Sequence, residues 1–308
     1  MRVVFMGTPD FSVPALENIA KRYEVVAVVT QQDRPKGRGH KMQYTPVKEK
    51  AIELEIPVYQ PKRVKDPEFV NILKTLKPDV IVVIAFGQIL SKEILELPKY
   101  GCINVHASLL PKYRGAAPIQ WAVINGDKKS GVTTMYMAEG LDTGDIIDTS
   151  EIVLDEKETG GSLFDKLADL GGQLILNTLD KLETGTATRT RQDDARSTYA
   201  GKITKELGKI DFTKSAVEIE RLIRGLNPWP SAFTYMDDKM LKIWNADVLE
   251  ETVEEEPGTI TEVNKKFIKV ATGEGYLLLK EIQLEGKKRM DVTSFLNGYN
   301  FTTNKLGN

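Results

Sequence analysis

The amino-acid sequence predicts an α/β protein with a mostly parallel sheet, followed by a smaller β-rich domain. Up to about residue 185, short β-branched runs alternate with amphipathic stretches, which is typical of a parallel sheet with helices on both faces. Residues 80–85 are apolar throughout, as expected for a strand buried on both sides. From residue 229, short alternating runs are separated by Asp, Gly and Asn, which favours antiparallel strands. The two parts are therefore expected to be a Rossmann-like sheet and a small OB-like β-barrel.

The order of the elements supports this division. In the first part we predict strands at residues 2–6, 25–30, 79–85 and 102–106, and helices near 11–21, 45–54, 66–76 and 116–125. A hairpin or a sheet extension is expected at 132–137 and 146–153, followed by a closing helix near 161–182. In the second part we predict one helix near 215–226 and strands at 233–236, 240–248, 258–263, 267–271 and 276–283. Residues 184–204 are polar without an apolar period, so a surface linker is expected there. The predicted domains are 1–185 and 205–308, joined by a linker at 186–204.

The composition excludes several classes of protein. With 41% hydrophobic residues, 28% charged residues and a net charge of -2, the chain is not disordered, and any nucleic-acid surface must come from local charge. Cys102 is the single cysteine, which excludes an intrachain disulfide framework and a Cys-rich zinc site. The sequence begins directly with a strand, and its longest apolar run, residues 80–86, is too short to span a bilayer. We therefore expect a cytoplasmic protein without a membrane segment or a bound metal.

The turn after the first strand argues against a dinucleotide enzyme. A Rossmann protein would carry G-x-G-x-x-G there, but the segment G-T-P-D-F at residues 7–11 has only one of these glycines. NAD binding is therefore not expected. The segment can be a simple strand-to-helix turn capped by Thr8 or Asp10, or a turn that also borders a ligand cleft.

The segment G-C-I-N-V-H-A-S-L-L-P-K-Y-R-G-A-A-P at residues 101–118 carries the candidate chemistry. Because side chains alternate along a strand, Asn104 and His106 project to the same face. They lie near the carboxyl end of the strand, where open α/β sheets bind ligands. The other histidine of the chain is His40, so His106 is the candidate general acid/base. Asp142, in a glycine-flanked loop, can orient the imidazole, although such a carboxylate can equally be a turn former.

These motifs resemble the signature of the 10-formyltetrahydrofolate-dependent formyltransferases. The match consists of I-N-V-H-A-S-L-L-P-K-Y-R-G-A-A-P, followed downstream by G-L-D-T-G-D. The resemblance implies a catalytic triad of Asn104, His106 and Asp142 that transfers a formyl group from 10-formyltetrahydrofolate to an amine. Asn104 and His106 would stabilise the developing oxyanion, and Asp142 would fix the imidazole tautomer. This chemistry requires no metal.

The resemblance also indicates where the folate binds. The residues expected to contact it are Ser108, Leu109, Leu110 and Pro111. A second stretch would wall the pterin pocket with its backbone groups, and it contains Phe86, Gly87, Gln88 and Leu90. The alternative for this second stretch is simple hydrophobic core.

Residues 31–48 form a basic segment that indicates the acceptor. The segment contains Arg34, Lys36, Arg38, Lys41 and Lys48 against a single acid, Asp33. It could be a solvated loop, but a basic loop also suits phosphate binding. The pattern Q-x-D-R-P-x-G-R-G-x-K is similar to the inserted loop of the methionyl-tRNA formyltransferases, which wedges against the acceptor end of tRNA. The resemblance therefore implies tRNA binding by Arg34, Lys36, Arg38 and Lys41, with Arg38 the most important.

The C-terminal part agrees with this resemblance more loosely. The I-D-F segment at 210–212, the helix with Arg221 and Arg224, and N-P-W-P at 227–230 look like the C-terminal domain of the same enzymes. Six further cations could form a basic face, namely Lys265, Lys266, Lys269, Lys287, Lys288 and Arg289. Phosphate contacts of this kind position a nucleic acid without reading its sequence.

The expected function is formyl transfer to the α-amino group of methionyl initiator tRNA by a monomeric enzyme. A sugar-nucleotide formyltransferase would share the triad but would have less use for the basic segment. A formyltetrahydrofolate hydrolase would transfer the formyl group to water, and glycinamide ribonucleotide formyltransferase would need no C-terminal barrel. A nucleic-acid-binding protein whose α/β part is only structural would not need the triad.

Overall fold

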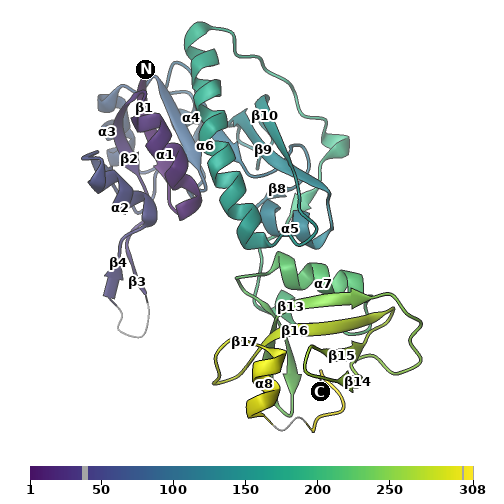
Figure 1. Cartoon of the computed structure of the whole chain (residues 1–308). Coiled ribbons are helices and arrows are strands. Elements are labelled where there is room, and N and C mark those ends of the chain that lie inside the picture. Colours follow the sequence, from purple (N-terminus) through teal and green to yellow (C-terminus); the bar gives the residue numbers. More distant parts are fainter. Residues whose placement is uncertain (37–40, 300–301, 308) are drawn as a thin grey trace. The chain divides into compact units, whose positions relative to one another are not determined.

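The computed structural model describes residues 1–36, 41–299 and 302–307, and the chain divides into two compact units (Figure 1). The first unit consists of Met1–Gly115, Lys129–Val153 and Phe164–Ala200. The second consists of Ala116–Lys128, Leu154–Leu163 and Gly201–Asn308. The chain therefore passes between the units more than once, whereas the sequence suggested one division near residue 185.

A seven-stranded sheet forms the centre of the first unit. Its strands are β1 (Arg2–Gly7), β2 (Glu24–Val29), β5 (Val58–Tyr59), β6 (Val80–Ile84), β7 (Cys102–His106), β9 (Lys129–Tyr136) and β10 (Ile146–Val153), in the spatial order β10-β9-β7-β6-β1-β2-β5. The pairs from β7 to β5 are parallel, and β9 and β10 add an antiparallel hairpin at one edge. Every residue of β6 is buried, as its uninterrupted apolar sequence predicted. The expected mostly parallel sheet is confirmed.

Helices cover both faces of this sheet. They are α1 (Val13–Ala20), α2 (Pro46–Glu53), α3 (Pro67–Leu76), the single turn α4 (Lys92–Leu95) and the long α6 (Gly160–Thr184), with the short 3₁₀ turn η1 (Asp10–Ser12) ahead of α1. On one face, α3 and α4 place Phe69, Leu73 and Ile94 in an apolar cluster with Cys102 of β7. Side chains alternate along β7, so Asn104 and His106 project to the same face as Cys102.

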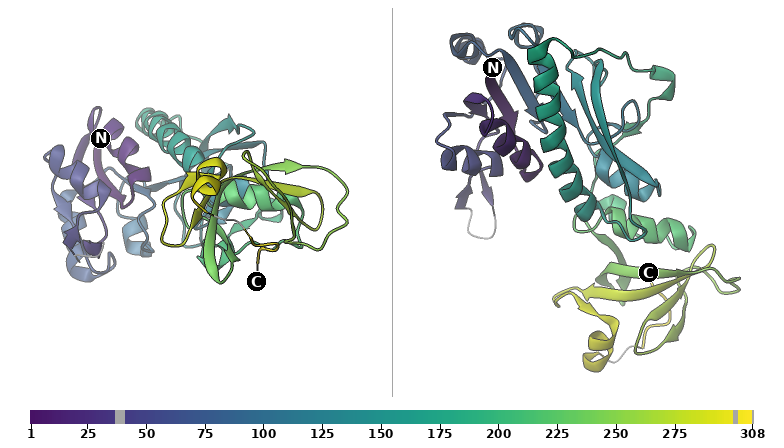
Figure 2. Two further views of the ribbon diagram at one scale, coloured as in Figure 1. Left: turned by 60° about the horizontal axis from the view of Figure 1, so that its bottom comes forward. Right: turned by 45° about the horizontal axis from the view of Figure 1, so that its top comes forward.

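The opposite face of the sheet carries α1 and α6 (Figure 2). A Cβ atom added to Gly171 would lie 3.1 Å from Val105 of β7, and one added to Gly172 would lie 3.1 Å from the backbone of Pro14 in α1. The two glycines of α6 therefore let this helix approach the sheet and α1 closely.

Two short pairings complete the first unit. β3 (Arg34–Lys36) and β4 (Lys41–Gln43) form an antiparallel pair, here named the basic ladder, which projects away from α1 and α2 (Figures 1 and 2). β8 (Arg114–Gly115) pairs in parallel with β11 (Tyr199–Ala200). Since β11 and the 3₁₀ turn η2 (Asp194–Arg196) lie within the expected linker, much of that segment belongs to the first unit.

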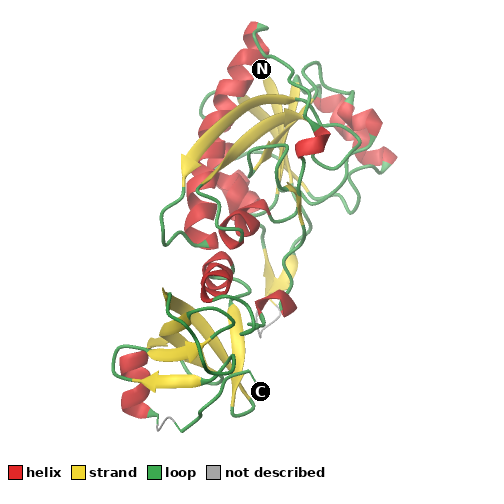
Figure 3. Ribbon diagram, turned by 90° about the vertical axis from the view of Figure 1, so that its right-hand side faces the viewer, coloured by secondary structure: helices red, strands yellow, loops and turns green. Residues whose placement is uncertain are grey.

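The second unit is built on an antiparallel sheet (Figure 3). Its strands are β12 (Ala232–Met236), β13 (Lys239–Leu249), β14 (Ile260–Val263), β15 (Ile268–Ala271), β16 (Tyr276–Leu284) and β17 (Met290–Asp291), in the order β12-β13-β16-β15-β14 with β17 also paired to β16. In β12, alternate residues are buried, as expected for a sheet with one covered face. All five predicted strands of this part are present.

Helices accompany this sheet in the second unit. They are α5 (Pro118–Ile124), α7 (Ala216–Gly225) and α8 (Val292–Gly298), with the 3₁₀ turn η3 (Glu206–Gly208). α7 begins with a capping box in which Ser215 and Glu218 satisfy each other's backbone N–H groups. It buries Ile219 and Ile223 against the sheet. The helix α8 was not predicted from the sequence.

Candidate active site

The candidate segments of the first unit converge on the carboxyl edge of its parallel strands. β1 lies between β2 and β6, so the strand order reverses there, and such a switch point opens a ligand crevice in doubly wound sheets. The turn at Gly7 ends β1, the basic ladder follows β2, residues 85–90 follow β6, and His106 ends β7. The fold thus brings together segments that lie far apart in the sequence.

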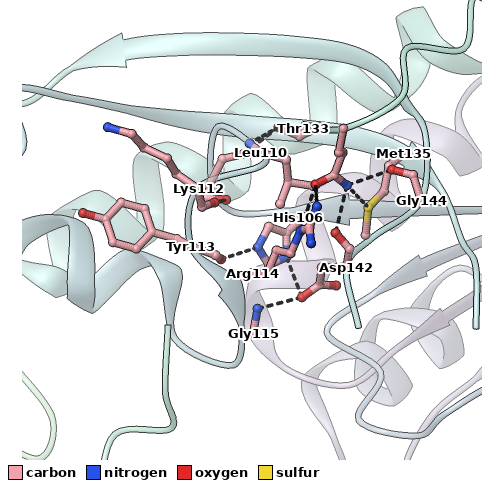
Figure 4. Close-up of polar contacts among 12 residues, drawn as sticks. His106, Leu110, Lys112, Tyr113, Arg114, Gly115, Thr133, Met135, Asp142 and Gly144 are labelled. Atoms are coloured by element: carbon pink, nitrogen blue, oxygen red, sulfur yellow. Dashed lines mark hydrogen bonds and ion pairs between the residues drawn. The ribbon is translucent and has the colours of Figure 1, made fainter. Parts of the chain in front are cut away.

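His106 and Asn104 lie side by side in the sheet, opposite Thr133 and Met135 of β9. The exposed fractions of their side chains are small, at 7% for His106 and 9% for Asn104. The imidazole Nε2 of His106 donates to the carbonyl oxygen of Tyr113 over 2.8 Å (Figure 4). Among the residues that the structure describes, the Asn104 amide has no hydrogen-bond partner, so its N–H groups are free for a ligand.

Asp142 completes the predicted triad. Its Oδ2 lies 3.7 Å from Nδ1 of His106, which is within ion-pair range but longer than a hydrogen bond. The same oxygen accepts a 2.8 Å hydrogen bond from the backbone N–H of Gly115. Asp142 adopts a left-handed backbone conformation (φ 52°), which aspartate tolerates better than most residues. The loop therefore directs the carboxylate toward the imidazole, as the sequence motif suggested.

Gly115 is required by its surroundings. Its φ is 115°, which side-chain-bearing residues rarely adopt. A Cβ atom there would lie 2.7 Å from the carbonyl oxygen of Ala200 and from the ring of Tyr199. Glycine at this position therefore lets the backbone N–H reach Asp142 while β8 pairs with β11.

Residues 108–111 form a turn held by β9. The hydroxyl of Thr133 donates to the carbonyl oxygen of Ser108 over 2.6 Å and accepts from the backbone N–H of Leu110 over 3.1 Å. The Ser108 hydroxyl donates to the carbonyl oxygen of Lys112 over 2.6 Å. The Leu110–Pro111 peptide bond is cis. Ser108 and Leu110 are buried, whereas Leu109 and Pro111 are half-buried.

Part of the stretch after β6 packs in the hydrophobic core. Phe86 and Leu90 belong to the apolar cluster under α3 and α4. The Gln88 amide oxygen accepts from the backbone N–H of Val64 over 2.7 Å. Gly87 has a φ of 81° and carries no side chain. A ligand at this edge could therefore meet backbone groups and the side chain of Ile89, which is 86% exposed.

The basic ladder places Arg34 opposite Gln43 and Lys36 opposite Lys41. Arg34 is exposed, and so are the apolar side chains of Met42 (61%) and Tyr44 (48%). Arg38, expected to be the most important cation of this segment, lies outside the described residues.

A polar network fixes the base of the ladder. Lys48 Nζ lies 2.5 Å from Asp33 Oδ2 and 2.8 Å from the amide oxygen of Gln60. The Gln60 amide nitrogen donates to Asp33 Oδ1 and to the carbonyl oxygen of Gln31, both over 2.8 Å. The hydrogen bond from Lys48 lowers the pKa of the Asp33 carboxyl. Within the described residues, the single acid of the segment is thus paired with Lys48.

Several cations of the second unit have structural partners. Arg224 Nε lies 2.7 Å from Glu220 Oε1, and its Nη1 donates to the carbonyl oxygen of Glu158 over 2.6 Å. Arg289 forms two hydrogen bonds with Glu281 and lies 4.5 Å from the centre of the Trp244 ring. The predicted cations Lys265, Lys266, Lys287 and Lys288 are exposed.

Sequence reasoning gave no role to Gln192, Thr133 or Arg114. Gln192 is 5% exposed, and its amide contacts the loop of Asp142. It lies in the polar segment expected to be a linker, where no local signal marks one glutamine for burial. Arg114 lies inside the quoted signature, and Thr133 lies in a predicted strand.

Other kinds of site receive no support from the described residues. Within 1–36, 41–299 and 302–307 there is no group of three or more His, Cys, Asp or Glu side chains that could hold a metal. No helix in the described ranges is long and apolar enough to cross a membrane. Burial raises the pKa of the Cys102 thiol to about 12, so it is not a thiolate nucleophile near neutral pH.

Comparison with known proteins identifies the family. The family described as "Formyl transferase" matches residues 1–179, and "Formyl transferase, C-terminal domain" matches residues 202–300. The chain is 59% identical to the methionyl-tRNA formyltransferase of Lachnospira eligens, covering 97% of this chain and 96% of the relative. It is 55% identical to that of Clostridioides difficile, covering 98% of both.

Solved structures share the fold at lower identity. WlaRD, a sugar 3N-formyl transferase, has a TM-score of 0.68 at 20% identity and covers 94% of this chain and 99% of its own. An N-formyltransferase from Helicobacter canadensis has a TM-score of 0.67, also at 20% identity, with the same coverage. The fold is thus common to enzymes with different acceptors. The full-length relatives show that this chain belongs to the formyl transferase family, among the methionyl-tRNA formyltransferases.

Proposed function

We propose that this protein transfers the formyl group of 10-formyltetrahydrofolate to the α-amino group of methionyl initiator tRNA, giving N-formylmethionyl-tRNA. The convergence of Asn104, His106 and Asp142 at the carboxyl edge of the sheet carries this proposal. The full-length relatives support the choice of acceptor. Such a reaction belongs to translation initiation, so we infer a cytoplasmic enzyme, acting as a monomer and without a metal.

The folate would lie beside the triad, against residues 108–111 and 86–90. When bound, it supplies the formyl carbon that the amine attacks, and negative charge develops on the formyl oxygen. The unpaired Asn104 amide can donate to that oxygen, and a donor of this kind is typically worth about 10²–10³ in rate.

His106 would accept a proton from the attacking amine and later donate it to the leaving group. The Tyr113 carbonyl holds a proton on Nε2, so Nδ1 is the nitrogen that can gain or lose one. Asp142 Oδ2 lies 3.7 Å from Nδ1, and its charge would stabilise the imidazolium form. The amine proton would pass to Nδ1 and then to the folate nitrogen as its bond to the formyl carbon breaks.

The basic ladder would contact the phosphates of the tRNA. Arg34, Lys36 and Lys41 belong to its two strands, and Arg38 falls between them in the sequence. Cations of this kind supply sequence-independent affinity. The exposed lysines of the second unit would add further phosphate contacts. A sugar N-formyltransferase is the competing function, but it is suggested only by a fold shared at 20% identity.

Transfer of labelled formyl from 10-formyltetrahydrofolate tests the proposal. The parallel acceptors are methionyl initiator tRNA, free methionine, glycinamide ribonucleotide and an amino-sugar nucleotide. We expect label on the tRNA alone. Label on another acceptor, or released as formate, would contradict the proposed acceptor while keeping formyl chemistry.

A further inference from the structure

Residues 190–200, here named the strap, run past both loops that hold the triad. At the start of the strap, Thr190 exchanges two backbone hydrogen bonds with Ile146, over 2.8 and 2.9 Å, where the loop of Asp142 enters β10. Near its end, Thr198 accepts from the backbone N–H of Arg114 over 2.9 Å and, through its hydroxyl, from that of Tyr113 over 2.8 Å. The strap is therefore attached to each loop at one of its ends.

Gln192 joins the two loops between these attachments. Its Nε2 donates to the carbonyl oxygens of Asp142 and Gly144, both over 2.8 Å. Its Oε1 accepts from Nε and Nη2 of Arg114, over 3.0 and 2.8 Å. The amide nitrogen of Gln192 therefore bonds to the Asp142 loop, and its amide oxygen bonds to Arg114.

The residues beside Arg114 hold the two catalytic side chains. Tyr113 accepts from His106 Nε2 over 2.8 Å, and Gly115 donates to Asp142 Oδ2 over 2.8 Å. The Gln192 bridge therefore links the peptide that holds the imidazole to the loop that carries its carboxylate. A shift of either loop would change the 3.7 Å separation between His106 and Asp142.

We propose that Gln192 is a positioning residue for formyl transfer, which fixes the Asp142 loop against Arg114 and so sets the carboxylate beside His106. The proposal rests on the proposed function, because it takes the triad to be catalytic. Without the amide, the buried carbonyl group of Gly144, the partly buried carbonyl group of Asp142 and part of the Arg114 guanidinium lose their partners. Arg114 would keep only its 2.8 Å contact with the exposed carboxylate of Asp194. A loop shift of about 1 Å can cost roughly 100-fold in rate.

The test compares Gln192→Met with the wild type in single-turnover formyl transfer. Methionine keeps the length of the side chain but cannot hydrogen bond as the amide does. We expect the rate constant to fall about 10- to 100-fold, with the affinities for folate and tRNA changed by less than about threefold. Gln173→Met, at an exposed position of α6, is the matched control and should keep the wild-type rate.

A double-mutant cycle separates positioning from a general structural role. Asp142→Asn removes the group through which Gln192 acts, so adding Gln192→Met to it should cost less than about threefold more. If Gln192→Met does not fold, Gln192→Glu replaces it, since Glu keeps the Arg114 contacts and loses the two N–H donors. A wild-type rate in either folded variant would overturn the proposal. So would a fold-loss in rate from Gln192→Met that is as large in the Asp142→Asn background as in the wild type. If the wild type formylates another amine, the proposed function fails, and the same cycle run with that amine still tests Gln192.

Discussion

The triad loops and the basic ladder of the first unit are held in opposite ways. The loops that hold His106 and Asp142 are fixed by backbone groups, by a glycine in tight contact and by a buried glutamine. Among the described residues, Asp33, Lys48 and Gln60 hold the ladder at its base, and Arg34 on its first strand is exposed. Chemistry that stabilises a developing charge needs donors fixed in advance, whereas phosphate contacts need accessible cations.

Changes at the triad should give the largest effects. We predict that His106→Ala lowers kcat by about 10²–10⁴, because proton transfer through a placed side chain contributes that much. Asp142→Asn should also lose most of the rate while it keeps folate binding and the fold. Single-turnover rates, folate titration and thermal unfolding measure the three quantities. Near-normal turnover in Asp142→Asn would contradict the triad.

Gly115→Ala tests the tight contact that supports the triad loops. The added Cβ would meet the Ala200 carbonyl oxygen at 2.7 Å in a backbone with φ 115°. We expect a loss of about 1–3 kcal/mol in stability and a fall in kcat of roughly 10- to 100-fold as Asp142 moves. Gly185→Ala is the control, because Gly185 has a positive φ but a Cβ atom added there would have no neighbouring described atom within 4 Å. It should lose some stability and keep kcat, and equal rate losses in the two variants would count against the role of Gly115.

Arg34→Ala tests the other side of the comparison. We predict a several-fold loss in kcat/KM for charged tRNA at low salt. The slope of log(kcat/KM) against the logarithm of the salt concentration should become shallower by about 1, as for one lost phosphate contact. The rate at saturating tRNA and the affinity for folate should stay unchanged. Lys21→Ala, at an exposed cation after α1, is the matched control. A fall in kcat alone would mean that the ladder serves the chemistry.

Asp33→Asn should give the smallest effect, which is a change in how the free energy of unfolding depends on pH. The pKa of Asp33 is lowered by its hydrogen bond from Lys48, so its stabilising contribution is present above the unfolded-state pKa of about 3.9. That contribution is lost as pH falls through the lower folded-state pKa. We expect the variant to be less stable than the wild type by about 1 kcal/mol at pH 7, with the difference shrinking as the pH falls below about 3.9. Chemical denaturation at several pH values measures it, and a constant difference would exclude this origin.

Much of the fold could be predicted from the sequence because its signals are local, and the candidate triad was indicated by resemblance to the formyltransferase signature. The apolar run of β6 indicated a central strand, and the period of two along β7 placed Asn104 and His106 on one face. Asp142 was selected by the resemblance of G-L-D-T-G-D to that signature, since its glycine-flanked loop alone can equally be a turn. The carboxyl edge then followed from the general geometry of parallel sheets.

The supports of the triad could not be predicted in this way. Arg114 and Gln192 are 78 residues apart, and the residues around Gln192 show no periodicity, so composition indicated only a surface linker. The hydrogen bond from His106 to Tyr113 uses a backbone carbonyl, which leaves no trace in residue type. Phe86 and Leu90 were expected at the wall of a pocket, with hydrophobic core as the alternative. Their side chains belong to a core cluster, and the sequence could not distinguish these two environments.

The strap determines where a catalytic fragment of this chain can end. The two family matches leave a gap between residues 179 and 202, and the polar composition there suggests a safe place for truncation or proteolytic cleavage. A fragment cut at residue 185 would nevertheless lose Gln192, Thr198 and β11, and with them the restraints on both triad loops. We therefore expect the shortest fragment with an intact catalytic geometry to extend at least to Ala200, and a nick before Gln192 to inactivate a chain that otherwise remains folded.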